Sequence, residues 1–211
     1  MKTDDLIDAL AVSLEPVKPA RPSIPYLAAA ACASLAAVAI LLGIRPDLPA
    51  GLQTPALWLK SAYTLALAGG GLWLVQRLGR PGADARPALR ALLAIVALAV
   101  ACGAVEMVLT PPSERLAEWL GRTWKICGRN ILVVSCFTAP FVFLSVRRLA
   151  PTRLTASGAA IGMTAGALAA TAYGVLHCPE PTAAFVATWY TLGVAAAGAA
   201  GALTGRFALR W

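Results

Sequence analysis

Six long apolar blocks constrain the fold of this chain more than any other feature of its sequence. A helix needs ~20 residues, at a rise of 1.5 Å each, to cross the hydrocarbon core of a bilayer. Five blocks have about that length, and the fourth reaches it if its helix begins near Cys127. The blocks comprise residues 26–44, 57–75, 89–109, 131–146, 154–176 and 183–208. The sequence therefore predicts an all-α membrane protein with a bundle of six transmembrane helices.

The composition agrees with lipid as part of the solvent. The chain is 59% hydrophobic and 13% charged, whereas a soluble domain carries about 25% charged residues. Its formal net charge of +8 would suit nucleic acid, but the basic residues are scattered between apolar blocks and do not form one face. Scattered basic residues of this kind indicate membrane topology. We therefore expect the lipid bilayer as a partner and no direct contact with nucleic acid.

The orientation follows from the lysines and arginines at alternate ends of the blocks. The end that includes both termini carries twelve: Lys2, Lys18, Arg21, Arg77, Arg80, Arg86, Arg90, Arg147, Arg148, Arg153, Arg206 and Arg210. The other end carries six: Arg45, Lys60, Arg115, Arg122, Lys125 and Arg129. The richer side is expected to be cytoplasmic. Both termini should therefore lie inside the cell, with the protein in a bacterial inner membrane.

The segment before the first block predicts a short amphipathic helix over residues 3–15. Thr3 can cap it, and Asp4 and Asp5 complement its dipole. An apolar stripe follows at helical spacing: Leu6, Ile7, Leu10, Ala11 and Leu14. Prolines after residue 15 then form a stiff tether. We therefore divide the chain into an N-terminal cytoplasmic segment, residues 1–25, and a transmembrane domain, residues 26–211.

So short a helix is marginal alone, so its stripe needs a partner. Helices that lie on membranes are usually basic, whereas this one is acidic and is repelled by anionic lipid. A basic groove on a partner protein suits it better. The alternative is packing on the cytoplasmic face of the protein itself. The candidate binding residues are Asp4, Asp5, Leu6, Ile7, Asp8, Leu10 and Leu14.

Small residues recur at four-residue spacing in two blocks. The fifth block contains Gly158, Gly162 and Gly166, and the sixth contains Gly193, Ala197, Gly201 and Gly205. Such stripes let helix backbones approach closely in lipid. They predict tight helix packing in preference to a pore, and they would also serve to pair two copies in a homodimer.

Glu106 is the one acidic residue inside an apolar block, and an ionisable group there is a functional candidate. It lies only about four residues, or ~6 Å of helix, from the outer end of its block. It could therefore reach the interface or pair with a basic residue of the third connection. A proton-coupled transporter would need more buried charges or broken helices than this chain offers.

Two of the five cysteines differ from the rest. Cys32, Cys102 and Cys136 fall within apolar blocks and are expected to be small buried hydrophobes. Cys127 and Cys178 fall near the outer rim of one helical hairpin, where their Cα atoms could approach within ~4.4–6.8 Å, as a disulfide requires. A structural disulfide, two unrelated thiols and a sensing pair all remain open.

Other thiol chemistries have less support. The chain has no Cys-x-x-Cys motif, so a thiol oxidoreductase with its own exchange pair is poorly supported. His177, Cys178, Glu180 and Cys127 could supply four zinc donors, but their spacing matches no familiar pattern. We therefore assign no catalytic residue, no cofactor and no certain metal site.

Several short motifs, in this order, resemble the NrsF-like family of membrane anti-sigma factors over the whole chain. They are the start Met-Lys-Thr-Asp-Asp-Leu-Ile-Asp-Ala-Leu, Trp124-Lys-Ile-Cys127, Tyr173-Gly-Val-Leu-His-Cys178-Pro-Glu180 and Trp189-Tyr190. The resemblance implies a non-enzyme that holds a sigma factor of the extracytoplasmic-function (ECF) type at the membrane, away from RNA polymerase. It also implies that Cys127 and Cys178 are periplasmic cysteines that take part in sensing metal or oxidative stress.

The resemblance and the residues suggest one mechanism, in which stress changes the bonding of Cys127 and Cys178, shifts the helices and releases the sigma factor. Two rival functions remain. A small transporter or channel would use Glu106 and the glycine stripes. A quinone-linked membrane thiol oxidoreductase would use the outer cysteines.

Overall fold

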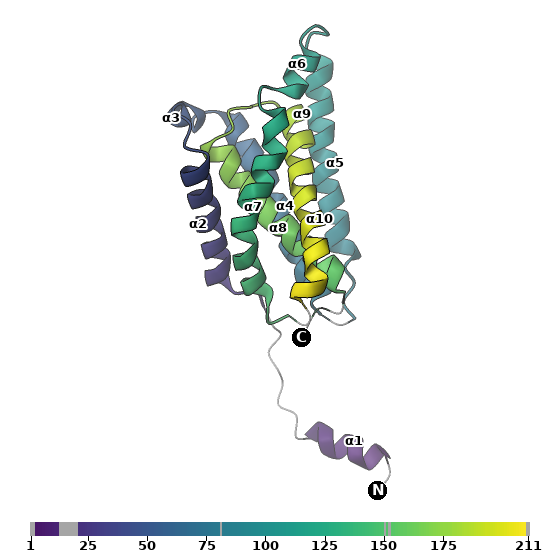
Figure 1. The fold of residues 1–211 in the computed structure, drawn as a ribbon. Helices are drawn as coiled ribbons and strands as arrows, with labels where there is room; N and C mark the ends of the chain where they lie inside the picture. Colours follow the sequence, from purple (N-terminus) through teal and green to yellow (C-terminus); the bar gives the residue numbers. More distant parts are fainter. Residues whose placement is uncertain (1–2, 13–20, 81, 150, 152, 210–211) are drawn as a thin grey trace.

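A computed structural model describes residues 3–12, 21–80, 82–149, 151 and 153–209. Every regular element in this part of the chain is a helix (Figure 1), which confirms the all-α prediction. The long helices are α2 (Ile24–Leu41), α4 (Pro55–Leu78), α5 (Arg86–Leu109), α7 (Trp124–Val146), α8 (Leu154–Leu176) and α10 (Thr191–Ala208). A short helix, α9 (Ala183–Phe185), and a π-helical turn, η1 (Val186–Tyr190), lead directly into α10.

Five helical segments of the described residues are long and apolar enough to cross a membrane. They are Ile24–Leu41, Arg86–Leu109, Arg115–Val146, Leu154–Leu176 and Ala183–Ala208. The fourth predicted block is thus long enough, because α7 begins at Trp124, before Cys127. The helix of the second block, α4, has 24 residues but is not among the five, since polar residues and three consecutive glycines interrupt its apolar sequence. Six crossings therefore remain a prediction.

Helix α8 lies at the centre of the bundle, where it packs against α10, α4, α7 and α2. Its glycine stripe faces the small residues of α10, as predicted. A Cβ built on Gly162 would meet the carbonyl oxygen of Ala197 and lie 3.1 Å from Gly201 Cα. Both stripes are thus occupied within one chain, and the homodimer through them stays a prediction.

Hydroxyl groups join the helices across their buried faces. Ser34 on α2 and Thr138 on α7 share a hydrogen bond of 2.8 Å. The Thr171 hydroxyl on α8 donates to the Thr64 hydroxyl on α4, also at 2.8 Å. Such bonds matter in lipid, where burial of apolar surface does not drive helices together.

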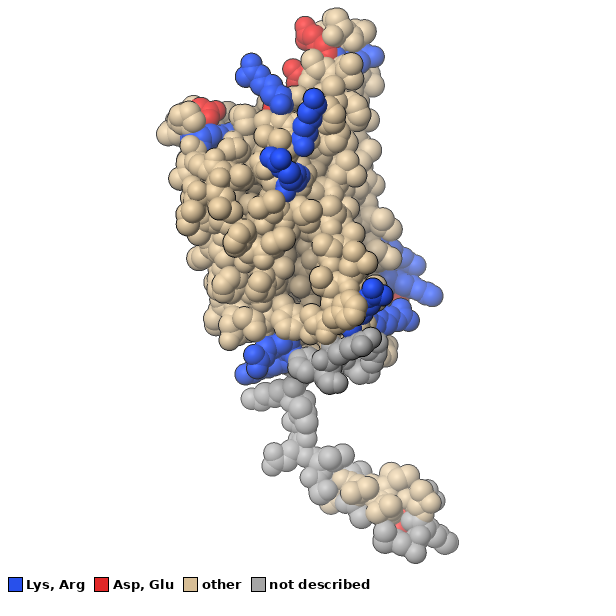
Figure 2. Space-filling view, in the orientation of Figure 1, with Lys and Arg blue, Asp and Glu red and all other residues tan. Residues whose placement is uncertain are grey.

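The bundle has two distinct ends. At the terminal end, α2 begins and α10 ends (Figure 1), and the Ser23 amide donates to the Ser145 carbonyl at 2.8 Å. At the distal end lie the connections 42–54, 110–123 and 177–182, which include α3 (Leu48–Gly51) and α6 (Arg115–Leu120). Figure 2 shows lysines and arginines at both ends and an almost uncharged band between them.

The N-terminal helix α1 covers Thr3–Val12, which confirms a helix there, and the rest of the predicted helix, up to residue 15, lies outside the described residues. Its apolar side chains Leu6, Ile7, Leu10 and Val12 are all exposed. Leu14 and the side chain of Asp4, which we assigned to partner binding, lie outside the described residues.

The prediction for the three cysteines inside apolar blocks was wrong. Cys32, Cys102 and Cys136 are exposed. Cys32 and Cys102 lie on α2 and α5, of whose apolar windows only 22% and 11% is buried. Outward positions on these peripheral helices face the surroundings of the bundle. A thiol is apolar enough to face lipid without penalty.

Candidate functional site

The structure brings Cys127 and Cys178 together at the distal end of the bundle. Cys127 lies in the first turn of α7, and Cys178 follows the last residue of α8. Both side chains are fully buried in one apolar cluster. Both are free thiols, within hydrogen-bonding reach of each other. We call these two residues the thiol pair.

Local backbone geometry positions Cys178. The amides of His177 and Cys178 both donate to the Tyr173 carbonyl, at 3.0 and 2.9 Å, which closes the end of α8 in a tight turn. The turn directs the sulfur of Cys178 into the bundle, 3.8 Å from the hydroxyl oxygen of Thr123. The hydroxyl of Tyr190 faces the same sulfur. The thiol pair therefore lies in a closed pocket of polar and aromatic groups.

Lys60 is the functional candidate that the sequence analysis missed. Its side chain is only 6% exposed, and its ammonium donates to the carbonyls of Cys178 at 2.9 Å and Glu180 at 3.1 Å. The ammonium also lies 5.8 Å from the centre of the Tyr190 ring. We had counted Lys60 only toward topology. A lysine inside an apolar block was the signal that could have identified it.

Arg45 holds the same turn from another side. Its guanidinium donates to the Cys178 carbonyl at 3.3 Å, and its amide donates to the Leu176 carbonyl at 2.8 Å. Hydrogen bonds from charged donors are roughly twice as strong as neutral ones. Lys60 and Arg45 therefore fasten the connection 177–182 to α4 and to the α2–α3 connection. We call this pair of side chains the cationic clamp.

The surroundings of Cys178 favour its ionised form. Cys127, which lies within hydrogen-bonding reach, is the main cause that lowers the pKa of Cys178 to about 5, and the positive charge of Lys60 adds to it, against the opposing effect of burial. A thiolate is the form of cysteine that reacts with oxidants and binds soft metals. The pocket thus favours a thiolate at Cys178 beside the thiol of Cys127.

A lid made by the connection 110–123 covers the thiol pair. The Arg122 amide donates to the Glu180 carboxylate at 2.8 Å, and the Thr182 hydroxyl donates to the Glu118 carbonyl at 3.2 Å. The indole of Trp119 donates to Thr188 at 3.1 Å and stacks on Trp189, with ring centres 5.8 Å apart. These contacts separate the thiols from the surface.

The four residues that were considered as zinc donors do not gather around one point. His177 Nδ1 lies 3.0 Å from the Gly43 carbonyl, and the Glu180 carboxylate accepts the Arg122 amide. Among the described residues, no group of three or more His, Cys, Asp or Glu side chains is placed to hold a metal ion. A soft metal would therefore find two sulfur ligands here, without a complete site.

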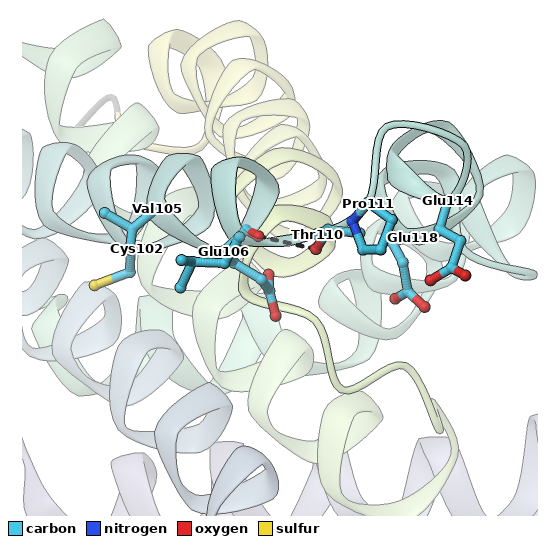
Figure 3. Close-up of a pocket in the computed structure, with 8 residues that line it drawn as sticks. Cys102, Val105, Glu106, Thr110, Pro111, Glu114 and Glu118 are labelled. Atoms are coloured by element: carbon cyan, nitrogen blue, oxygen red, sulfur yellow. Dashed lines mark hydrogen bonds between the residues drawn. The ribbon is translucent and has the colours of Figure 1, made fainter.

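Glu106 has a contact that the sequence did not suggest. Its carboxylate accepts the Ala184 amide at 2.9 Å and so caps the start of the last helical segment. It also lines a pocket of about 540 Å³ at the distal end of α5, together with Glu114 and Glu118 (Figure 3). The cap accounts for an acidic residue at this depth without a transport role.

These features define the class as an all-helical membrane protein with a buried thiol pair. The family model for NrsF, the negative regulator of sigma F, matches residues 10–211. The chain is 39% identical over 216 residues to the anti-sigma-F factor NrsF of Caulobacter vibrioides and 40% identical over 216 residues to the probable anti-sigma-F factor NrsF of Azospira oryzae. Each alignment covers 100% of both chains.

The chain therefore belongs to the NrsF family. The names of its relatives describe regulators and not enzymes, which confirms both the resemblance and the non-enzymatic role inferred from it. No solved structure matches the chain.

Proposed function

We propose that this protein is an anti-sigma factor that sequesters an ECF-type sigma factor at the bacterial inner membrane and releases it under metal or oxidative stress. In this proposal residues 1–25 bind the sigma factor, and residues 26–211 form the membrane domain that responds to stress. The names of the relatives support the regulatory role. The binding and sensing parts rest on the geometry described above.

The observation that carries the binding proposal is the exposed apolar face of α1. Leu6, Ile7 and Leu10 are 43–58% exposed, on a helix that also carries Asp5 and Asp8. An isolated helix of ten residues is marginal in water, so a partner that covers this face stabilises it. A groove with an apolar floor and basic edges on the sigma factor fits both its shape and its charge.

The topology completes the proposal. In it, α4 forms the sixth crossing, since its 24 residues extend about 36 Å. Its polar residues Lys60, Ser61 and Thr64 are buried inside the bundle, so the surrounding lipid does not meet them. With six crossings, the basic terminal end faces the cytoplasm and the thiol pair lies on the opposite side.

The sensing step follows from the chemistry of the thiol pair. A two-electron oxidant would convert the Cys178 thiolate and the Cys127 thiol into a disulfide, taking up two electrons while one proton is released. A soft cation such as cadmium would instead displace the Cys127 proton and bind both sulfurs. Either change alters the distance between the start of α7 and the end of α8. The cationic clamp ties the same turn to α4 and to the α2–α3 connection. A shift of this turn would therefore also move those two parts of the bundle.

The binding proposal is tested by co-purification of the sigma factor with the membrane protein. Leu6→Asp/Ile7→Asp and deletion of residues 2–15 should each abolish co-purification. Leu116→Asp makes the same change at an exposed residue (64% exposed) of the distal end and should leave it intact. Retention of the sigma factor by the deletion variant would refute the proposal.

The sensing proposal is tested with a reporter of sigma-dependent transcription. Cys127→Ser and Cys178→Ser should each abolish induction by chromate, cadmium or peroxide, because neither a disulfide nor a two-sulfur metal site can form. Cys102→Ser, a change at an exposed cysteine, should preserve it. Normal induction in both thiol-pair variants would reject the sensing role.

The rival functions have less support in the geometry. Glu106 and the glycine stripes, on which a transporter or channel would depend, cap one helix and pack two others. A quinone-linked thiol oxidoreductase has less support because the names of the relatives describe regulators and not enzymes.

A further inference from the structure

A basic cavity lies at the terminal end of the bundle, far from the thiol pair. It has a volume of about 770 Å³ and lies between the end of α4, the α4–α5 connection and the start of α8. Four arginines line it: Arg77, Arg80, Arg86 and Arg153. Figure 2 shows basic residues gathered at this end of the molecule. The volume is in the range of about 300–1,000 Å³ that holds small organic ligands.

The charge of these arginines is not neutralised by the described residues. The one ion pair found among the described residues joins Arg45 to Asp47 and lies at the other end of the bundle. Among the described residues that line the cavity, Asp84 is the only acidic one, and its carboxylate accepts the Arg86 amide at 2.9 Å, where α5 begins. Four guanidinium groups therefore surround the cavity opposite one carboxylate that is already hydrogen-bonded. Its occupant should be anionic.

The other walls of the cavity are apolar. Leu74 and Leu78 from α4, Leu89 from α5 and Met163 from α8 line it, and Leu89 is 50% exposed on the outer surface of the bundle. A ligand that matches both surfaces carries an anionic head and a hydrocarbon portion. The planar fork of arginine pairs well with phosphate oxygens.

We propose that this cavity binds the phosphate headgroup of an anionic phospholipid, with the upper part of an acyl chain against Leu74, Leu89 and Met163. Basic pockets between transmembrane helices on the cytoplasmic side commonly hold such headgroups. An acidic amphipathic helix such as α1 would also match both surfaces, but Leu89 is exposed on the outer surface of the bundle, which lipid reaches directly. The site is independent of sigma-factor binding and of the thiol pair, so it stands or falls separately from the proposed function.

The test uses the full chain, purified in a neutral detergent and titrated with phosphatidylglycerol. Tryptophan fluorescence reports the rise in melting temperature, from which an apparent affinity follows. For each variant, the melting temperature with lipid is compared with that of the same variant without lipid. A variant that is only less stable is therefore not mistaken for one that binds lipid more weakly. We expect phosphatidylglycerol to stabilise the protein, and phosphatidylcholine and glycerol 3-phosphate to have little effect. An equal response to either of these two would overturn the proposal.

Two double variants distinguish a defined site from general attraction to basic residues. Arg80→Gln/Arg86→Gln should weaken the apparent affinity about thirtyfold, from ~1 kcal/mol for each lost hydrogen bond between a guanidinium and the phosphate. Arg147→Gln/Arg148→Gln removes the same charge from exposed residues of the same end that do not line the cavity. It should leave the affinity within about threefold of that of the unchanged protein. Equal losses in the two variants would refute a defined site.

A further variant tests whether α1 occupies the cavity in place of lipid, because this helix is acidic. The chain without residues 2–15 should bind phosphatidylglycerol with unchanged affinity. A gain of about tenfold, or ~1.4 kcal/mol, would assign the cavity to the N-terminal segment and overturn the lipid proposal.

Discussion

At the scale of single residues, Lys60 combines an unfavourable location with well-placed partners. An ammonium inside a membrane bundle is costly unless acceptors replace its water. Here two carbonyls accept its protons and the ring of Tyr190 lies close by. The carbonyls of Cys178 and Glu180 in turn need a donor in place of water, since both residues are buried, and Lys60 is that donor.

Lys60→Met should therefore lower stability by ~1–3 kcal/mol, because it leaves the buried carbonyl of Glu180 without its charged donor and the carbonyl of Cys178 with Arg45 alone. The measurement is thermal unfolding of the purified protein in detergent. Lys125→Met makes the same change on an exposed side chain and should stay within ~0.5 kcal/mol of the unchanged protein. Equal effects of the two substitutions would show that the contacts of Lys60 contribute nothing.

Cys178 predicts a pH dependence of stability. Its pKa is lowered from 9.0 to about 5 in the folded protein, chiefly by Cys127, which lies within hydrogen-bonding reach. Between these values the unfolded chain binds the proton and the folded chain does not, so stability should rise with pH. The melting temperature of the protein minus that of Cys178→Ser should therefore increase from pH 5 to pH 9 and level off above pH 9. A difference that is constant or falls across this range would contradict the assignment.

At the scale of helices, the interface between α8 and α10 depends on the absence of side chains. The backbone of α10 lies so close to Gly158 and Gly162 that a Cβ at either position would meet backbone atoms, which cannot move aside as a flexible side chain can. Gly69 on α4 is different, since a Cβ there would have nothing within 4 Å. A glycine is thus required for close packing on α8, whereas on α4 the position of Gly69 has room for a side chain.

Gly162→Ala should destabilise the protein by ~1–3 kcal/mol through overpacking. Gly69→Ala should be neutral or should stabilise it by up to ~1 kcal/mol, because alanine favours a helix over glycine. Thermal unfolding of the two variants, which differ only in position, measures the contrast. The close approach of α8 and α10 would be disproved if Gly162→Ala were as stable as Gly69→Ala.

The cap formed by Glu106 can be separated from a functional role by two substitutions. Glu106→Ala removes the acceptor of the Ala184 amide and should cost ~0.5–2 kcal/mol, as loss of a helix cap does. Glu106→Gln keeps an oxygen acceptor and should come close to the unchanged protein in both stability and sigma-factor regulation. Loss of regulation in a stable Glu106→Gln variant would restore Glu106 as a functional residue.

At the scale of the whole molecule, the number of crossings decides which connections share a compartment. With α4 as the sixth crossing, α3 and the α4–α5 connection lie on opposite sides of the membrane. Without it they lie on the same side. The bundle itself accommodates α4, whose polar residues face α8 and the thiol pair.

Single cysteines in a cysteine-free background test this topology. Leu52→Cys, at the distal end, should react with a membrane-impermeant maleimide in intact spheroplasts. Ala83→Cys, between α4 and α5, should react only after the membrane is permeabilised. Labelling of both positions in intact spheroplasts would reject the sixth crossing.

The positions of the helices could be predicted from the sequence because length and local composition decide them. The fifth apolar block and α8 have identical bounds, residues 154–176, and the sixth block matches the segment Ala183–Ala208.

The contacts of the site could be predicted only in part. The motifs around Cys127 and Cys178 placed both thiols near one rim, because a hairpin returns its ends to the same side. The clamp by Lys60 and Arg45 and the cap by Glu106 join residues that are 78–133 positions apart in the chain. No local pattern encodes such distances.

The sequence by itself thus determined an all-α membrane protein of the NrsF family, because apolar length and ordered motifs are local properties. Only the tertiary structure decided which way the side chains face. It turned Cys32 and Cys102 outward, enclosed the thiol pair and placed a lysine beside it. The reason is physical: helix packing selects one face of each helix, and in blocks that are apolar all round the sequence does not mark that face.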